Sequence, residues 1–217
     1  MKRFTTFLLT AQFMFIFSPE LFSQSGPGVQ EFGLNAGAFT NFPANQNYLK
    51  DNMSVFYVAP YLRMGQHEFS AGLLYPVKAQ SMIFTEEKIN PRLGAVAGYK
   101  FYVFDAEGRE NLFIHYSFQY LRFSGSYDKD FSTDHPVHIT ETDMYINNVI
   151  GLGYNLFFDM NARFGLYYTL DYVISQTSIR LGAKDSQNYW TTQYVWNNIS
   201  TNIGFIFKIT SLKKKAK

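Results

Sequence analysis

The sequence predicts an all-β protein: an eight-stranded antiparallel up-and-down transmembrane β-barrel preceded by a cleavable signal peptide. Three observations predict it. Eight segments of about ten residues alternate apolar and polar side chains, the connectors between them alternate in length, and the apolar faces carry almost no charge. Period-two segments separated by turns are the sequence pattern of an outer-membrane barrel.

Composition sets the limits of this interpretation. The 217 residues suffice for one domain, and 19% are aromatic whereas only 17% are charged. A soluble protein of this composition would risk aggregation. A net charge of +2 without a dominant basic patch argues against nucleic-acid binding. The absence of cysteine excludes disulfides, thiolate metal sites and a cysteine nucleophile.

The first residues have the pattern of an export signal. Lys2 and Arg3 precede the apolar stretch "FLLTAQFMFIF", and a proline with small residues follows. This order is typical of a secretory signal peptide, which we expect to span residues 1–24. An uncleaved anchor is the alternative, but the apolar run is shorter than the roughly 20 residues that span a bilayer. Later segments contain no apolar run long enough for a membrane helix.

The first four strands of the predicted barrel, residues 30–210, fall at about 31–41, 55–64, 68–75 and 92–104. Each has one bulky apolar face, opposed by Gly, Ser, Asn and a few charged residues. The apolar faces include Phe32, Leu34 and Ala36, then Phe56, Val58 and Leu62, then Phe69, Leu73 and Tyr75, and finally Leu93, Tyr99 and Phe101. This alternation is the period of a pleated strand.

The last four strands are expected at about 112–120, 146–158, 164–175 and 197–209, followed by a basic periplasmic tail at 211–217. Their apolar faces include Leu112, Ile114 and Phe118, then Ile150, Leu152 and Tyr154, then Leu166, Tyr168 and Leu170, and finally Ile203, Phe205 and Phe207. The opposite faces again carry small polar residues.

The connectors indicate the orientation. Three are short ("GQ", "DAEGREN" and "DMNA"), and four are long, at 42–54, 77–91, 124–141 and 183–193. Short periplasmic turns that alternate with long outer loops are typical of outer-membrane barrels. The even strand number then places both termini in the periplasm.

The apolar face is predicted to meet lipid. In a soluble barrel, which is the alternative, charged residues cover the outside, but here the non-apolar face is small and nearly uncharged. Closing the sheet would satisfy every backbone group that lipid cannot. Tyr75, Tyr120 and Tyr172 fall near the expected outer ends of their strands, as in an aromatic belt.

A set of ionisable residues falls on the inward face. These are Glu31, Arg63, Glu68, Lys100, His115 and Asp171. Unpaired burial would cost several kcal/mol each, so we expect an interior polar network that plugs the lumen. The functional alternative is a gated proton or ion path.

Two constellations resemble catalytic or metal sites. His135 and His138 lie beside acids in "STDHPVHITETD", but the spacing matches no zinc motif and a polar loop is the simpler interpretation. Ser117, His115 and Asp171 could form a hydrolase triad, but no oxyanion donor is evident. We therefore expect no catalytic residue, metal or cofactor.

The stretches "GLNAGAF", "LGAVAGYKFYVF", "IGLGYNLFF" and "NIGFIFKI" resemble the small outer-membrane β-barrel proteins of Gram-negative bacteria, above all the eight-stranded barrel domain of the Bacteroidetes group. The resemblance implies the outer membrane as the location. It departs from the common pattern at the C-terminus, where ten residues follow Phe207.

The function expected from this resemblance is that of a non-enzymatic, monomeric barrel. Such a barrel anchors four outer loops, which are able to bind an extracellular ligand. Outer-membrane lipid and, during biogenesis, the barrel assembly machinery are the expected partners. A lipid-modifying enzyme and an accessory factor for secretion or envelope assembly are the alternatives.

Overall fold

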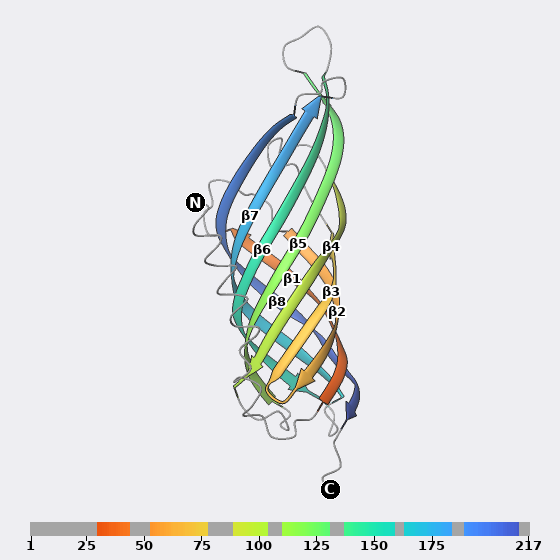
Figure 1. Cartoon of the computed structure of the whole chain (residues 1–217), viewed down its shortest axis with the longest axis vertical. Helices are drawn as coiled ribbons and strands as arrows, with labels where there is room; N and C mark the ends of the chain where they lie inside the picture. The colour runs from red at the N-terminus through yellow and green to blue at the C-terminus, as the bar shows by residue number, and fades with distance from the viewer. Residues whose placement is uncertain are drawn as a thin grey trace.

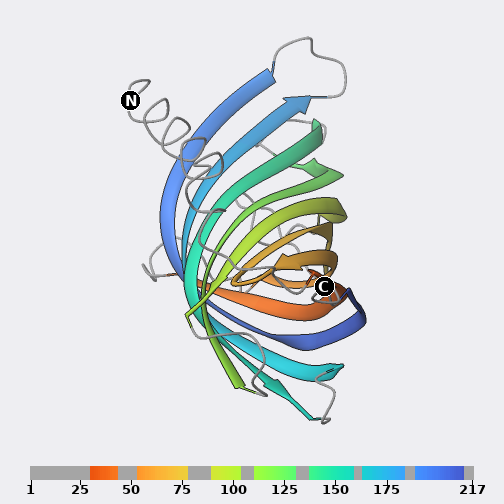
Figure 2. The same cartoon turned by 60° about the horizontal axis from the view of Figure 1, so that its bottom comes forward.

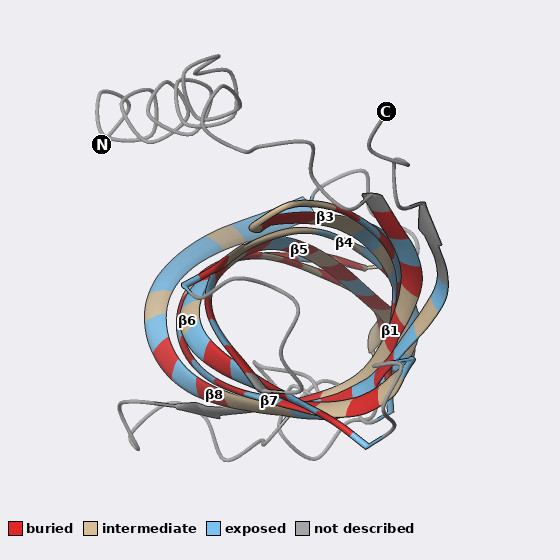
Figure 3. Ribbon diagram, turned by 90° about the horizontal axis from the view of Figure 1, so that it is seen from below, coloured by how far each residue is buried: buried red, intermediate tan, exposed pale blue. Residues whose placement is uncertain are grey.

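The protein is a closed barrel of eight antiparallel strands. The computed structural model describes residues 30–43, 53–77, 89–103, 110–130, 137–158, 163–183 and 189–212. The strands are β1 (Gln30–Pro43), β2 (Met53–Met64), β3 (His67–Pro76), β4 (Asn90–Tyr102), β5 (Glu110–Lys129), β6 (Val137–Phe157), β7 (Phe164–Ala183) and β8 (Tyr189–Leu212). Each strand pairs with the next, and β8 returns to β1, so the ring is complete (Figure 3). The predicted fold class is confirmed.

The sequence-predicted segments at the two ends of the chain lie outside the described residues. These are the signal peptide at 1–24 and most of the tail at 211–217, of which β8 includes the first two residues. The described residues contain no helix long and apolar enough to cross a membrane.

Side-chain direction alternates along every strand, as the buried and exposed bands in Figure 3 show. Many bulky apolar residues point outward: Ile203 is 59% exposed, and Leu170 is 55% exposed. The outward face is apolar from 93 to 101 in β4, from 112 to 120 in β5 and from 199 to 209 in β8, apart from Thr201. Runs of this length match the roughly 9–11 residues with which a tilted strand crosses a bilayer. We call this surface the apolar belt.

The strands differ in length in a way the sequence did not reveal. β5–β8 rise well above β1–β4 (Figure 1). Residues 125–129 of β5 have no partner in β4, and residues 189–197 of β8 have none in β1, among the parts of the chain that the structure describes. We call the raised part, residues 125–129, 137–141, 181–183 and 189–197, the projecting wall.

The predicted lengths of two of the long loops are therefore wrong, because both loops are shorter than expected. Most of 124–141 and of 183–193 is strand, which leaves only 130–136 and 184–188 as connectors. The physical reason is that most outward side chains in the projecting wall are polar, for example Ser126 and Thr140. Apolar residues such as Tyr127 and Ile139 instead point inward there, so the apolar-outward pattern of the belt is reversed, although the ladder of backbone hydrogen bonds continues.

Both chain ends of the barrel lie beside its short turns. Gln30 is in register with Met64 and with Leu212, so β1 begins and β8 ends next to the β2–β3 turn (Figure 2). Gly65 in that turn has a φ of 61°, a conformation that glycine adopts without steric cost. We call this the short-turn end.

Candidate functional site in the barrel lumen

An ion pair occupies the lumen at the short-turn end. Glu68 and Lys100 are in register on β3 and β4, and Lys100 Nζ lies 2.8 Å from Glu68 Oε1. Asn35 Nδ2 donates to the same oxygen at 3.0 Å, and Tyr102 Oη donates to Glu68 Oε2 at 2.6 Å. Glu68 is fully buried, so its charge is stabilised by these three partners rather than by water.

A second ion pair joins the first strand to the last. Glu31 Oε2 lies 2.8 Å from Lys208 Nζ, and Tyr61 Oη donates to Glu31 Oε1 at 2.6 Å. Lys208 is absent from the sequence-predicted network. The pattern could have found it, because it has the same inward parity as Ser200 and Asn202 on β8.

Arg63 faces the lumen without a carboxylate partner among the described residues. Its guanidinium carbon lies 3.5 Å from the centroid of the Tyr102 ring, and its Nε donates to the carbonyl of Gly65 at 3.1 Å. Although Arg63 is in register with Glu31, that carboxylate pairs with Lys208 instead. A cation held over an aromatic face gains electrostatic stabilisation.

Acids and bases face one another in the short-turn half of the lumen. In the described part of the chain, three acids there face three bases: Glu31, Glu68 and Asp171 against Arg63, Lys100 and Lys208. Glu31, Glu68, Arg63, Lys100 and Lys208, with the tyrosines that donate to the two glutamates, form a polar layer near the short-turn end. We call it the ionic layer.

His115 and Asp171 form a separate pair above the ionic layer. His115 Nε2 lies 2.6 Å from Asp171 Oδ1, and Thr169 Oγ1 donates to Asp171 Oδ2 at 2.8 Å. They line a cavity of about 60 Å³ that extends from Lys100 to Phe39. That volume can hold a few water molecules but no lipid chain or peptide.

The third member of the imagined triad does not join this pair. Ser117 lines the same cavity on the same strand face as His115, but it has no hydrogen bond to that imidazole. The structure therefore brings Ser117, His115 and Asp171 to one cavity without the nucleophile–base contact that a hydrolase needs.

Gly151 gives a test of the pair's role. A Cβ at this position would collide with the Asp171 carboxylate, and would come within 2.6 Å of the Leu170 carbonyl oxygen and within 2.8 Å of His115 Nε2. We expect Gly151→Ala to lower the free energy of unfolding by about 1–3 kcal/mol, because overpacking separates the pair. Urea unfolding in lipid vesicles measures this change. Gly98→Ala is a matched control, because the contact below 3 Å there is with a serine hydroxyl.

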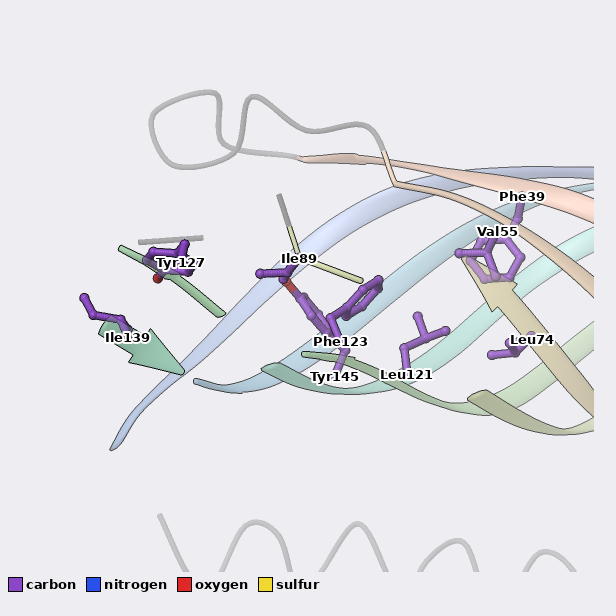
Figure 4. Packing of buried hydrophobic residues seen from close by; sticks show 9 residues of the cluster. All are labelled: Phe39, Val55, Leu74, Ile89, Leu121, Phe123, Tyr127, Ile139 and Tyr145. Atoms are coloured by element: carbon purple, nitrogen blue, oxygen red, sulfur yellow. The ribbon is translucent and has the colours of Figure 1, made fainter. Parts of the chain in front are cut away.

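Apolar side chains close the other end of the lumen. Figure 4 shows nine of them: Phe39, Val55, Leu74, Ile89, Leu121, Phe123, Tyr127, Ile139 and Tyr145. They lie where β1–β4 end and continue up the inner face of the projecting wall. We call this cluster the apolar plug. The lumen is thus filled by charged groups at one end and by hydrocarbon at the other.

Two carboxylates sit within the apolar plug. Glu141 and Asp143 are both buried, and Tyr127 Oη donates to Glu141 Oε2 at 2.5 Å. Burial, and next the charge of the neighbouring Glu141, raise the pKa of Asp143 to about 8. Asp143 lies above the apolar belt, since the outward neighbours at its level include Arg122 and Thr142.

The histidines near these acids do not join them. His138 points outward and its Nδ1 lies 2.6 Å from Asp128 Oδ1, whereas Glu141 and Asp143 point inward. His135 lies outside the described residues. Within the described ranges, no group of three or more His, Cys, Asp or Glu could hold a metal ion.

Comparisons with known proteins give no family. No protein family model matches the sequence, and no curated protein matches it. Among solved structures, the chain is similar to a major outer membrane protein from Thermus thermophilus, with a TM-score of 0.44 and 10% identity over 82% of this chain and 99% of that chain. It is also similar to the outer membrane protease OmpT from Escherichia coli, with a TM-score of 0.43 and 10% identity over 85% and 98% of the two chains.

Proposed function

We propose that the protein is a sealed, non-enzymatic barrel of the bacterial outer membrane that displays the projecting wall outside the cell. The observation that carries this proposal is the filled lumen: the ionic layer and the apolar plug obstruct both ends of the barrel. A barrel whose lumen is filled in this way serves best as an anchor for what it raises above the membrane.

The apolar belt supports a membrane location. Exposing Leu, Ile and Phe around the whole circumference is unfavourable in water and favourable in hydrocarbon. A closed ring of strands satisfies its backbone groups internally, as lipid requires. The Gram-negative outer membrane, and the Bacteroidetes-type family within it, are the setting we propose. Outer-membrane lipid and the assembly machinery are the proposed partners.

Conductance and lipase assays test the proposal. We expect the refolded mature protein in a planar bilayer to show no stable conductance steps, and we expect no hydrolysis of phospholipid. Regular open-channel currents would contradict the sealed lumen. Hydrolysis that Ser117→Ala abolishes would instead favour the enzyme alternative, for which the His115–Asp171 contact is the supporting observation.

The orientation of the barrel in the membrane is tested with single-cysteine variants. Because the chain has no cysteine, each variant reports on one site. We expect Ser126→Cys, exposed on the projecting wall, to react with a membrane-impermeant maleimide on intact cells. We expect Gln66→Cys, in the β2–β3 turn, to react only after the outer membrane is permeabilised. The reverse result would place the projecting wall in the periplasm.

A further inference from the structure

Two arginines lie side by side at the upper edge of the apolar belt. Arg92 of β4 and Arg122 of β5 are register partners, and both are exposed. The β4–β5 register shifts between Arg92 and Ala95, which places an extra residue in β4. This bulge lets Arg92 and Leu93 both face outward, since a bulge re-aims a side chain.

Like charges directly opposite each other destabilise a sheet unless an anion lies between them. Arg92 Nε donates to Ser124 Oγ at 3.0 Å, so a neutral hydroxyl holds this guanidinium. Among the described outward side chains near this pair, the acid is Asp128, which already pairs with His138. The described residues of the barrel therefore do not neutralise the positive charge of the arginine pair.

The position of Arg92 and Arg122 relative to the apolar belt indicates which anion could neutralise them. Directly below Arg92, Leu93 is 63% exposed within the apolar belt, and Phe118 lies below Arg122 on the same face of β5. Above the pair, outward residues are polar. The pair thus marks the boundary between hydrocarbon and headgroup, where lipid phosphate lies.

Arg180 adds a third cation two strands further around the barrel. It is exposed, in register with Thr142, and its guanidinium carbon lies 3.8 Å from the centroid of the Tyr189 ring. Neighbouring strands are about 4.8 Å apart, so Arg180 is separated from β5 by roughly 10 Å. Guanidinium groups bind phosphate through paired hydrogen bonds, which ammonium groups cannot match.

Building on the membrane placement proposed above, we infer that Arg92 and Arg122 bind a phosphate group of an outer-leaflet glycolipid, with Arg180 available to a second phosphate of the same headgroup. The lipid chains then lie along the apolar belt beside Leu93. The ligand class is a phosphomonoester lipid, and charge complementarity at the lipid boundary is what selects it.

The test measures lipid bound to the folded protein. The refolded mature protein in detergent is titrated with a bisphosphorylated lipid A, or with the same lipid after phosphatase treatment, and native mass spectrometry counts bound lipid. We expect the phosphorylated lipid to bind, and Arg92→Gln/Arg122→Gln to weaken its binding by about tenfold or more. Arg163→Gln, an exposed arginine near the opposite end, is the matched control and is expected to bind like the wild type.

Besides the absence of any lipid binding, three results would overturn the inference. These are equal binding of the dephosphorylated lipid, equal binding by the double variant, and displacement of the lipid by millimolar inorganic phosphate, which would indicate a free-anion site. Heat-dependent gel mobility checks that each variant is a folded barrel. If the double variant is not folded, the single variant Arg122→Gln is used in its place. A barrel that inserts into bilayers but binds no lipid contradicts this inference alone, whereas failure to insert contradicts the proposed membrane function.

Discussion

Replacing Lys100 by methionine is expected to lower the free energy of unfolding by about 3–5 kcal/mol, because it leaves the fully buried Glu68 carboxylate without its cation. Asn35 and Tyr102 still donate hydrogen bonds to this carboxylate, but they carry no compensating charge. Equilibrium urea unfolding in lipid vesicles measures the loss.

The double variant Lys100→Met/Glu68→Gln separates lost charge pairing from lost packing. It removes both charges, so we expect it to be more stable than Lys100→Met alone. Bilayer conductance of the single variant addresses the ion-path alternative: an increase would indicate that Lys100 obstructs a path through the lumen. Unchanged stability together with unchanged conductance would contradict both the plug and the path.

The second large effect is expected in the pH dependence of stability, and it comes from Asp143. Its pKa is raised from 3.8 to about 8 in the folded protein, so between these values the native state binds a proton that the unfolded chain releases. This contribution therefore destabilises the fold as pH rises from about 4 to about 8, by up to roughly 1.4 kcal/mol per pH unit.

Asp143→Asn abolishes this titration. We expect the stability difference between the variant and the wild type to grow in favour of the variant as pH rises through this range, measured by urea unfolding at several pH values. Glu141→Gln should reduce the wild-type slope in part, because it removes the neighbouring charge. Asp130→Asn, an exposed acid directly after β5, is the control. Parallel pH profiles for wild type and Asp143→Asn would contradict this account.

The barrel itself could be predicted because one rule governs every residue of the apolar belt. In β8, for example, Ile203, Phe205 and Phe207 face out whereas Ser200 and Asn202 face in, and this parity is readable from the sequence. The same rule assigned the six ionisable residues to the inner face, and their side chains lie in the lumen.

The partners in each ion pair and the lengths of the strands could not be predicted. The ion-pair partners depend on the register between strands, and the strand lengths depend on segments that lie outside the lipid. Glu31 pairs with Lys208 through the closure of β1 on β8, a contact between residues far apart in the sequence. Above the apolar belt, the outward faces of β5–β8 no longer meet lipid. Their outward residues, such as Ser126, are polar, and these segments were therefore mistaken for loops. Glu141 was placed in that predicted loop and Asp143 beside it. That both side chains are buried became evident only once this segment was found to be part of β6.

Whether the apolar face of the barrel meets lipid is tested most directly by following side-chain direction along β8 in a bilayer. Single cysteines at 198–208 carry a fluorescent label, and quenching by brominated lipid chains reports contact with hydrocarbon. We expect strong quenching at Ile199, Ile203, Phe205 and Phe207, and weak quenching at Asn198, Ser200, Asn202 and Ile206. Quenching with the opposite parity, or none at any position, would contradict a barrel whose apolar face meets lipid.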